Sequence, residues 1–234
     1  MFSLSDPHHF RKMVAGLCMI AAPLLMLVAA VITPVYETDV GKQLAAVAGD
    51  ADRFYIASLA TLVALILLVP AILGLMHMLR EREVAYGHLG GGLALLGSFL
   101  VMAIMGIQLV VWQMVAGGAD RAEMIALLDR VNDTTGIVVP LFILSFAFAL
   151  GFAILAAGLY RARAVHPWMA ILIAAGGVML PIGATIASEV VVSLGAVALL
   201  VGLGFTGWRV LMEPDSDWEH TPEVSGFRPL LGAR

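Results

Sequence analysis

Six long apolar segments dominate the pattern of hydrophobic and polar positions along the chain. Each runs for roughly 20 residues or more almost without charge, which is the length that an α-helix needs to cross a bilayer. The predicted membrane helices span residues 13–34, 54–79, 89–115, 134–160, 167–187 and 190–211. The sequence therefore predicts an all-α fold, a polytopic membrane bundle of six transmembrane helices.

The composition agrees with a membrane protein. Hydrophobic residues make up 61% of the chain and charged residues only 13%, whereas soluble domains have about 45–50% and about 25%. The first apolar segment is longer than the core of a signal peptide and lacks a small-residue cleavage pattern, so we expect it to be retained. We expect three regions: an N-terminal segment (1–12), the membrane domain (13–212) and a flexible tail (213–234), with a docking segment at 227–231.

The distribution of basic residues predicts the orientation. Seven Lys or Arg residues flank the helices on the side that carries both termini, and four lie on the other side. The seven are Arg11, Lys12, Arg80, Arg82, Arg161, Arg163 and Arg209. Because cytoplasmic loops are richer in Lys and Arg, we expect both termini in the cytoplasm. The opposite side has nine acidic residues against its four basic ones.

A weak internal repeat predicts three helical hairpins. His9, His88 and His166 each precede the start of an outgoing helix, at spacings of 79 and 78 residues. In the first two hairpins the outer connection is long, and "RAEMIALLDRVND" places Met124 and Leu128 on one helical face. We expect short amphipathic helices after the first and third membrane helices. The third hairpin closes through a tight turn near Ser188.

Small residues recur every fourth position in the third predicted helix. The stripe contains Gly90, Ala94, Ser98 and Gly106, and the sixth helix has a similar stripe through Ala198 and Gly202. Such stripes let membrane helices approach closely. The motif "GHLGGG" also resembles a phosphate loop, but it follows no strand and precedes no lysine. We therefore interpret these glycines as helix-packing residues.

Histidines near the basic side are candidates for metal or haem binding. His77, His88 and His166 are expected at one depth, and histidine is the commonest metal ligand. Haem would need two axial ligands deep inside the bundle, and only His77 approaches that position. The alternative is that these residues anchor helix ends at the interface. Cys18 is the single cysteine, and we expect it to be a packing residue.

The middle of every predicted span lacks Asp, Glu, Lys and Arg. Proton-coupled pumps usually need such a group, so that mechanism is disfavoured. The best polar candidates for contact with a ligand are Gln108, Trp112 and Gln113, in "GIQLVVWQMV". Gln108 and Trp112 are four residues apart and share a helical face. A hydrogen bond between helices is the alternative role for Gln108.

Catalytic motifs such as HExxH and GxSxG are absent from the sequence, and paired carboxylates are missing from the spans. The leading hypothesis is a non-enzymatic membrane protein without a cofactor, either an accessory subunit or a binder of a hydrophobic ligand. The second is a transporter or exporter of a small neutral or lipophilic compound. The third is a haem or metal protein that uses the histidines. Expected partners are membrane lipids, other membrane subunits or further copies of the chain, and nucleic acid is not expected.

One segment carries a resemblance. Residues 151–181 contain a glycine and an arginine at a helix end, then a short loop and a helix that begins Pro-Trp (Gly158, Arg161, Pro167 and Trp168). In this order of residues at the helix end, the loop and the next helix start, the chain resembles a broad group of bacterial six-helix membrane proteins built from domains of unknown function. The resemblance implies a bacterial cytoplasmic membrane and no particular activity.

Overall fold

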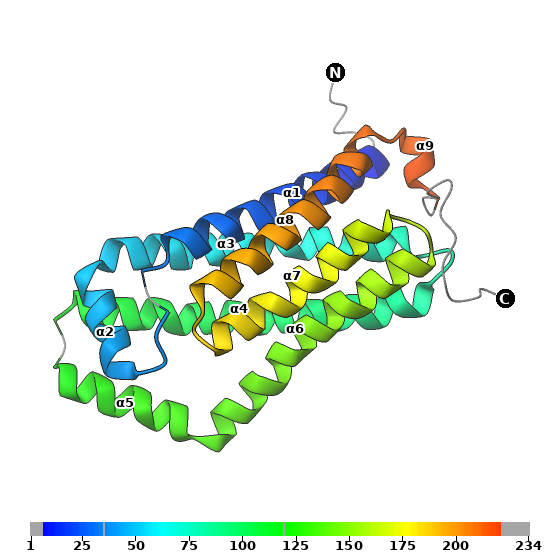
Figure 1. Ribbon diagram of the computed structural model, residues 1–234. Coiled ribbons are helices and arrows are strands. Elements are labelled where there is room, and N and C mark those ends of the chain that lie inside the picture. The colour runs from blue at the N-terminus through cyan, green and yellow to red at the C-terminus, as the bar shows by residue number, and fades with distance from the viewer. Residues whose placement is uncertain (1–6, 35, 119, 221–234) are drawn as a thin grey trace.

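The computed structural model describes residues 7–34, 36–118 and 120–220; the side chains of residues 7, 137, 138, 140–142 and 144 are not described. All regular structure in these ranges is helical (Figure 1). The helices are α1 (Pro7–Ile32), α2 (Val40–Gly49), α3 (Ala51–Met78), α4 (Val84–Ala116), α5 (Arg121–Asp133), α6 (Thr135–Arg161), α7 (Pro167–Thr185), α8 (Glu189–Met212) and α9 (Asp215–Trp218). The all-α prediction is thus confirmed.

The six long helices pack in a ring. Going round it, α1 contacts α3, α3 contacts α4, α4 contacts α6, α6 contacts α7, α7 contacts α8, and α8 returns to α1. The side chains that point inward form one buried core, in which Leu68, Ile72, Phe152, Leu155, Ile173 and Leu203 are all 0% exposed. The outward faces are also apolar, with exposed Ile66, Phe99, Phe146, Ile171 and Phe205. Helices that are apolar on every side are typical of a membrane environment.

Five helices are long and apolar enough to cross a membrane: α1, α3, α4, α7 and α8. In α6, the apolar stretch with described side chains is Ser145–Arg161. Most predicted spans agree with the observed helices, but α1 begins at Pro7 and α4 at Val84, earlier than the predicted residues 13 and 89. The predicted boundaries follow uninterrupted apolar content, whereas α1 continues through the mostly polar residues 8–12 and α4 through His88 and the residues before it.

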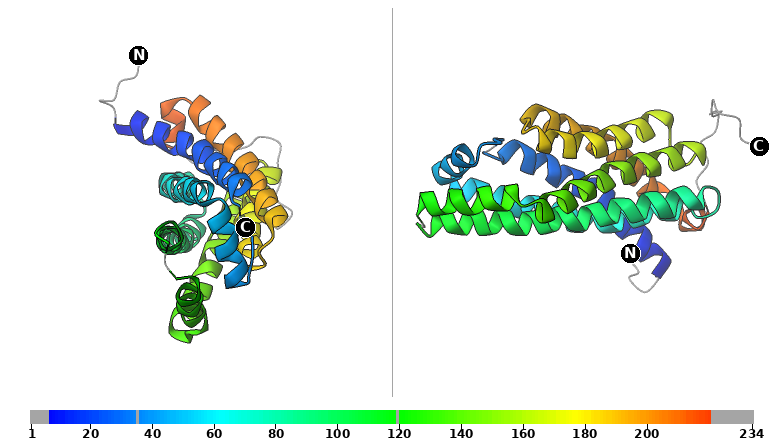
Figure 2. Two further views of the ribbon diagram at one scale, coloured as in Figure 1. Left: turned by 90° about the vertical axis from the view of Figure 1, so that its left-hand side faces the viewer. Right: turned by 90° about the horizontal axis from the view of Figure 1, so that it is seen from below.

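Helices α3 and α4 project past the α7–α8 turn (Figure 1 and Figure 2); α2 lies against the projecting part, and α5 lies beside α2. With 33 residues, α4 is about 50 Å long, well over the roughly 30 Å of a hydrocarbon core. Val40 and Leu44 of α2 and Met124 of α5 form a small core with Val111 of α4. The two connections predicted to form helices are therefore helical. We call this end of the ring the α2–α5 end.

The opposite end carries both termini of the described chain (Figure 1), and we call it the terminal end. Here α9 docks onto the bundle: Trp218 is 4% exposed and stacks on His77 with 4.6 Å between ring centroids. Lys12, itself only 4% exposed, donates to the Glu213 carbonyl at 2.7 Å and pairs with Asp215. Residues 213–220 of the predicted tail thus pack on the bundle, and the predicted docking segment at 227–231 lies outside the described residues.

The contact between α4 and α6 brings the two backbones close together. A Cβ atom added to Gly151 would lie 2.3 Å from the Ala94 backbone nitrogen, and one on Gly90 would lie 2.7 Å from the Leu155 nitrogen. Ala94 and Ser98 are both fully buried at this contact. Gly106 differs, because a Cβ there would meet nothing within 4 Å. The small-residue stripe of α4 therefore packs from Gly90 to Ser98 and is open beyond.

In the other small-residue stripe, on α8, Gly202 faces α7. A Cβ at this position would lie 2.9 Å from the Ile173 backbone nitrogen. Ala198, one turn earlier, is half-buried. The tight turn predicted before α8 is present: Ser188 caps α8 by accepting from the Val191 nitrogen at 3.4 Å, and Ala187 before it has a φ of 51°.

A substitution can test the α4–α6 contact. We expect Gly151→Ala to destabilise the protein by about 1–3 kcal/mol, because the added methyl group must push the two backbones apart. Gly106→Ala is the matched control on α4, where the methyl group has room, and it should leave stability unchanged or slightly higher. Thermal unfolding in detergent would measure both. Equal losses for the two variants would contradict close packing at Gly151.

The docking of α9 should depend on pH. Hydrogen bonds from Lys12 and from His8 lower the pKa of Asp215 and Glu219, respectively, below ordinary values of 3.8 and 4.5. Because each folded-state pKa is lowered, the stabilising contribution is present above the ordinary pKa and is lost as pH falls through the folded-state pKa. Docking should therefore be complete above pH 5 and weaken below about pH 4.

Trp218 fluorescence would follow this titration in a variant whose other three tryptophans are replaced by Phe. An acid transition to a solvent-exposed signal is expected. The matched variant Asp215→Asn/Glu219→Gln should show the exposed signal already at neutral pH. A Trp218 signal in that variant that stays buried from neutral to acid pH would rule out docking through these carboxylates.

Candidate functional site

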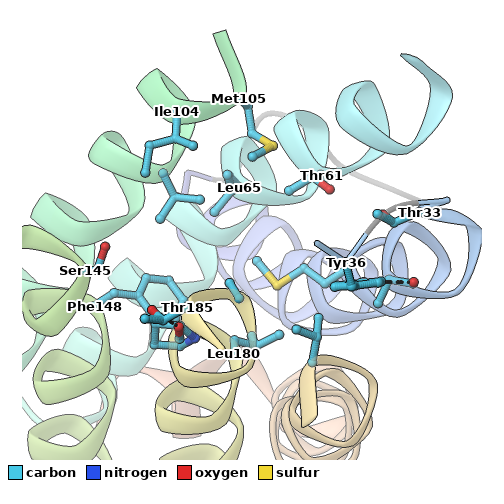
Figure 3. A pocket seen from close by; sticks show the side chains of 16 residues that line it. Thr33, Tyr36, Thr61, Leu65, Ile104, Met105, Ser145, Phe148, Leu180 and Thr185 are labelled. Carbon is cyan, nitrogen blue, oxygen red and sulfur yellow. Dashed lines mark hydrogen bonds between the residues drawn. The ribbon is translucent and has the colours of Figure 1, made fainter. Parts of the chain in front are cut away.

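A cavity of about 370 Å³ lies inside the ring toward the α2–α5 end, and all six long helices contribute to its lining (Figure 3). Leu65 and Phe148 lie on its side nearest the core, while the exposed Ala184 and Thr185 form its mouth. Most of the lining is apolar: Met26, Ala30, Leu65, Val101, Ile104, Met105, Phe148, Leu180, Pro181, Ala184 and Val192. Hydroxyl groups supply the polar part: Thr33, Tyr36, Thr61, Ser145 and Thr185.

Unequal helix lengths leave this space open. With 19 residues, α7 is about 28 Å long, whereas α4 continues for about 50 Å. The α7–α8 turn therefore comes before the ends of α3 and α4, as Figure 1 shows. The segment after α1 brings Tyr36 over the opening, where its hydroxyl donates to the Ala30 carbonyl at 3.0 Å.

The hydroxyl groups in the cavity use their protons on nearby backbone carbonyls. Thr33 donates to Ala29 at 2.7 Å, Thr61 to Ala57 at 2.9 Å and Thr185 to Pro181 at 2.8 Å. A hydroxyl that donates in this way still has an oxygen lone pair available as an acceptor. The cavity therefore offers acceptors to a ligand that carries a hydrogen-bond donor.

The cavity is also electrically neutral. Among its described lining residues Tyr36 is the one titratable side chain. Burial raises the pKa of this phenol above its ordinary value of 10.0; a hydrogen bond with Thr33 opposes this rise in part, and the negative charge of Glu189 adds to it. Tyr36 therefore stays protonated at physiological pH, and a charged ligand entering the cavity would lose hydration without gaining an opposite charge.

Of the three polar candidates on α4, none lines this cavity. The cavity reaches Ile104, and Gln108 lies one turn further along α4, half-buried. Trp112 packs beneath α2 and stacks on Tyr55 at 4.4 Å between centroids, while Gln113 is exposed. The cavity lining thus includes none of the three, and Trp112 lies in a separate cluster with Val47 of α2 and Phe54 of α3.

The three candidate histidines occupy different environments. His77 is half-buried against Trp218, and His88 is exposed with Nδ1 donating to the Val84 carbonyl at 2.9 Å. Both line one groove at the terminal end, which does not include His166. His166 is exposed and precedes the first residue of α7. Within the described ranges, no group of three or more His, Cys, Asp or Glu side chains is placed to hold a metal ion.

Sequence reasoning missed the hydroxyl-lined cavity and Trp218. The hydroxyl residues come from the segment after α1 and from α3, α6 and α7, and they are far apart in the sequence. Their positions toward the same end of successive helices were the available signal, but using it requires the order of helices around the ring. No protein-family model, curated protein or solved structure matches the chain. Its function must therefore be inferred from its own geometry.

The indole of Trp112 provides a test of that candidate position. Its Nε1 atom is buried without a hydrogen-bond partner among the described residues. Trp112→Phe keeps the stack on Tyr55 and removes the unpaired donor, so it should change stability by less than about 1 kcal/mol. Trp112→Ala should cost about 3 kcal/mol through lost packing. If chemical unfolding shows equal losses for the two variants, the indole N–H makes a stabilising hydrogen bond, which would contradict an unpaired donor at this position.

Proposed function

We propose that this protein is a non-enzymatic integral membrane protein that binds an uncharged lipophilic ligand in the central cavity. The single observation that carries the proposal is the lining: apolar side chains from six helices, with hydroxyl groups and no charged residue among the described ones. A volume of about 370 Å³ falls within the usual size range of small-molecule sites, roughly 300–1,000 Å³. The flexible side chains of Met26 and Met105 can adapt to an irregular apolar shape.

The proposal includes a specific membrane arrangement. All six long helices cross the cytoplasmic membrane as three hairpins, with both termini in the cytoplasm. Support for a sixth crossing comes from α6, which has 27 residues and a single charged residue, Arg161. Support for the orientation comes from the Lys and Arg residues, which are more numerous at the terminal end, as in cytoplasmic loops.

The chemical class of the ligand follows from the hydroxyl groups. Thr33, Thr61 and Thr185 present acceptor oxygens because their protons are already used. A ligand with a hydrocarbon body and one hydroxyl donor satisfies both the apolar walls and these oxygens. We therefore expect a long-chain or cyclic alcohol, or a phenol, and not a fatty-acid anion or a cation.

Binding is better supported than passage through the bundle. Between the cavity and the terminal end lies a layer of fully buried apolar side chains, including Leu68, Ile72, Phe152 and Leu155. Transport would need this layer to open, and close packing makes such a rearrangement costly. The transporter hypothesis thus needs a second conformation, whereas ligand binding needs only the observed one.

A photoreactive long-chain alcohol that carries a diazirine is a direct probe. Purified protein in lipid nanodiscs should be labelled on residues that line the cavity, such as Met26 and Met105, as mapped by peptide mass spectrometry. The double variant Ile104→Phe/Ala184→Phe fills the cavity from α4 and α7. It should lower labelling of these residues about tenfold, corresponding to a loss of about 1.4 kcal/mol in binding.

The matched control is Ala103→Phe/Ile182→Phe, which makes the same two exchanges on the same two helices. Ala103 and Ile182 are exposed and do not line the cavity, so this control should keep wild-type labelling. Labelling spread over the outer apolar faces, equal in both variants, would show that the probe detects only surrounding lipid. That result would refute the proposed site.

A further inference from the structure

A second hollow, separate from the central cavity, lies at the terminal end. We call it the basic groove; it has a volume of about 450 Å³ and is bounded by α1, α3, α4 and α9. Its rim contains Arg11, His77, Arg80 and His88, together with the aromatic rings of Phe10 and Trp218. Four nitrogen-bearing side chains thus face one space next to the membrane-spanning part of the bundle.

The positive charges of the rim lack carboxylate partners. Arg11 is exposed and makes no hydrogen bond or ion pair with any described residue. The Arg80 guanidinium contacts the His77 ring and donates to neutral carbonyls, those of His77 at 3.2 Å and Trp218 at 3.3 Å. An anion in the groove would therefore meet two guanidinium groups whose charge is not neutralised by an ion pair.

The acidic residues near the rim are bound to other partners. Glu219 interacts electrostatically with Arg80 and His77, but its carboxylate is paired with His8 at 2.6 Å. Glu81 is paired with His220 at 3.1 Å. These pairs hold α9 in place and leave the guanidinium groups of the groove available to an external anion.

Below the rim the groove becomes apolar and faces outward. Pro70 and Leu73 of α3 form one wall, and Leu73 is 50% exposed. Its floor lies where α1 and α3 touch, because a Cβ on Gly74 would be 2.8 Å from the Ala15 Cβ. From His77 to Pro70 the wall extends about 10 Å along α3. A hydrocarbon chain can lie along this wall while its head group stays at the rim.

We propose that the basic groove binds an anionic phospholipid, with the phosphate between Arg11 and Arg80 and an acyl chain against Pro70 and Leu73. A free phosphate would use the rim but not the wall, and a neutral lipid would use the wall but not the rim. The groove lies at the end that is richer in Lys and Arg, which we assign to the cytoplasmic leaflet, where anionic lipids attract basic residues. Binding here is independent of the ligand in the central cavity.

Lipid titration of the purified full chain in detergent tests this proposal. Native mass spectrometry would count bound lipids, and thermal unfolding would report their effect. Dioleoyl phosphatidylglycerol should bind and raise the unfolding temperature, whereas dioleoyl phosphatidylcholine and sn-glycerol 3-phosphate should do neither. Arg11→Glu should weaken phosphatidylglycerol binding at least tenfold. This variant should fold normally, because Arg11 makes no hydrogen bond or ion pair within the described chain.

Two further variants separate the groove from general surface charge. Arg82→Glu reverses one charge at the same end on a residue outside the groove lining, and it should leave binding nearly unchanged. Leu73→Ser removes part of the apolar wall and should also weaken phosphatidylglycerol binding.

Three outcomes would overturn the proposal. Equal losses in Arg11→Glu and Arg82→Glu would mean diffuse attraction by the surface. Binding of sn-glycerol 3-phosphate as strong as that of phosphatidylglycerol would identify a site for free phosphate. Equal binding of phosphatidylcholine would show that the rim does not select an anion.

Discussion

Close packing at glycine, against backbone at Gly151, Gly176 and Gly207, is the constraint on which the whole ring depends. Lipid tails are as apolar as the side chains, so helices in a membrane associate through packing and not through exclusion of water. Each of the six contacts around the ring has a glycine at which an added Cβ would lie under 3.0 Å from the neighbouring helix. In ring order these are Gly74, Gly91, Gly151, Gly177, Gly176 and Gly207.

The central cavity lies where one of these contacts ends. On α4 the glycine contacts with α3 and α6 extend to Gly97, and the next glycine, Gly106, has no neighbour within 4 Å. Val101 and Ile104, between these two glycines, line the cavity. The same stripe thus holds the helices together in its first half and allows them to separate in its second half. The opened space is lined by apolar side chains and acceptor hydroxyls of the surrounding helices and of the segment after α1.

Much of the fold could be predicted from the sequence, because each membrane helix is a local consequence of its own apolar length. The sequence also predicts helices in the connections around Val40–Gly49 and Arg121–Asp133, and in the second of these, apolar residues recur at helical spacing on one face. The stripe of Gly90, Ala94 and Ser98 was recognised from its spacing. In each case the signal lies within one segment of the chain.

The site could not be predicted, because it depends on which helices are neighbours. Thr33 and Thr185 line one cavity only because α8 packs against α1 and closes the ring, and no local pattern fixes that closure. Gln108 and Trp112 stand out in the sequence as polar residues in an apolar helix, but on α4 the cavity lining extends only from Val101 to Met105. Trp218 was missed because its partners His77 and Arg80 lie about 140 residues earlier.

The central claim is that an uncharged lipophilic molecule occupies the cavity between Leu65, Phe148 and Tyr36. An experimental structure of the protein extracted directly into native nanodiscs, without detergent, would test this most directly. We predict one continuous non-protein density against the apolar walls, with a polar end within hydrogen-bond distance of a threonine hydroxyl. A cavity filled by ordered water, or closed by inward movement of Ile104 and Phe148, would contradict it.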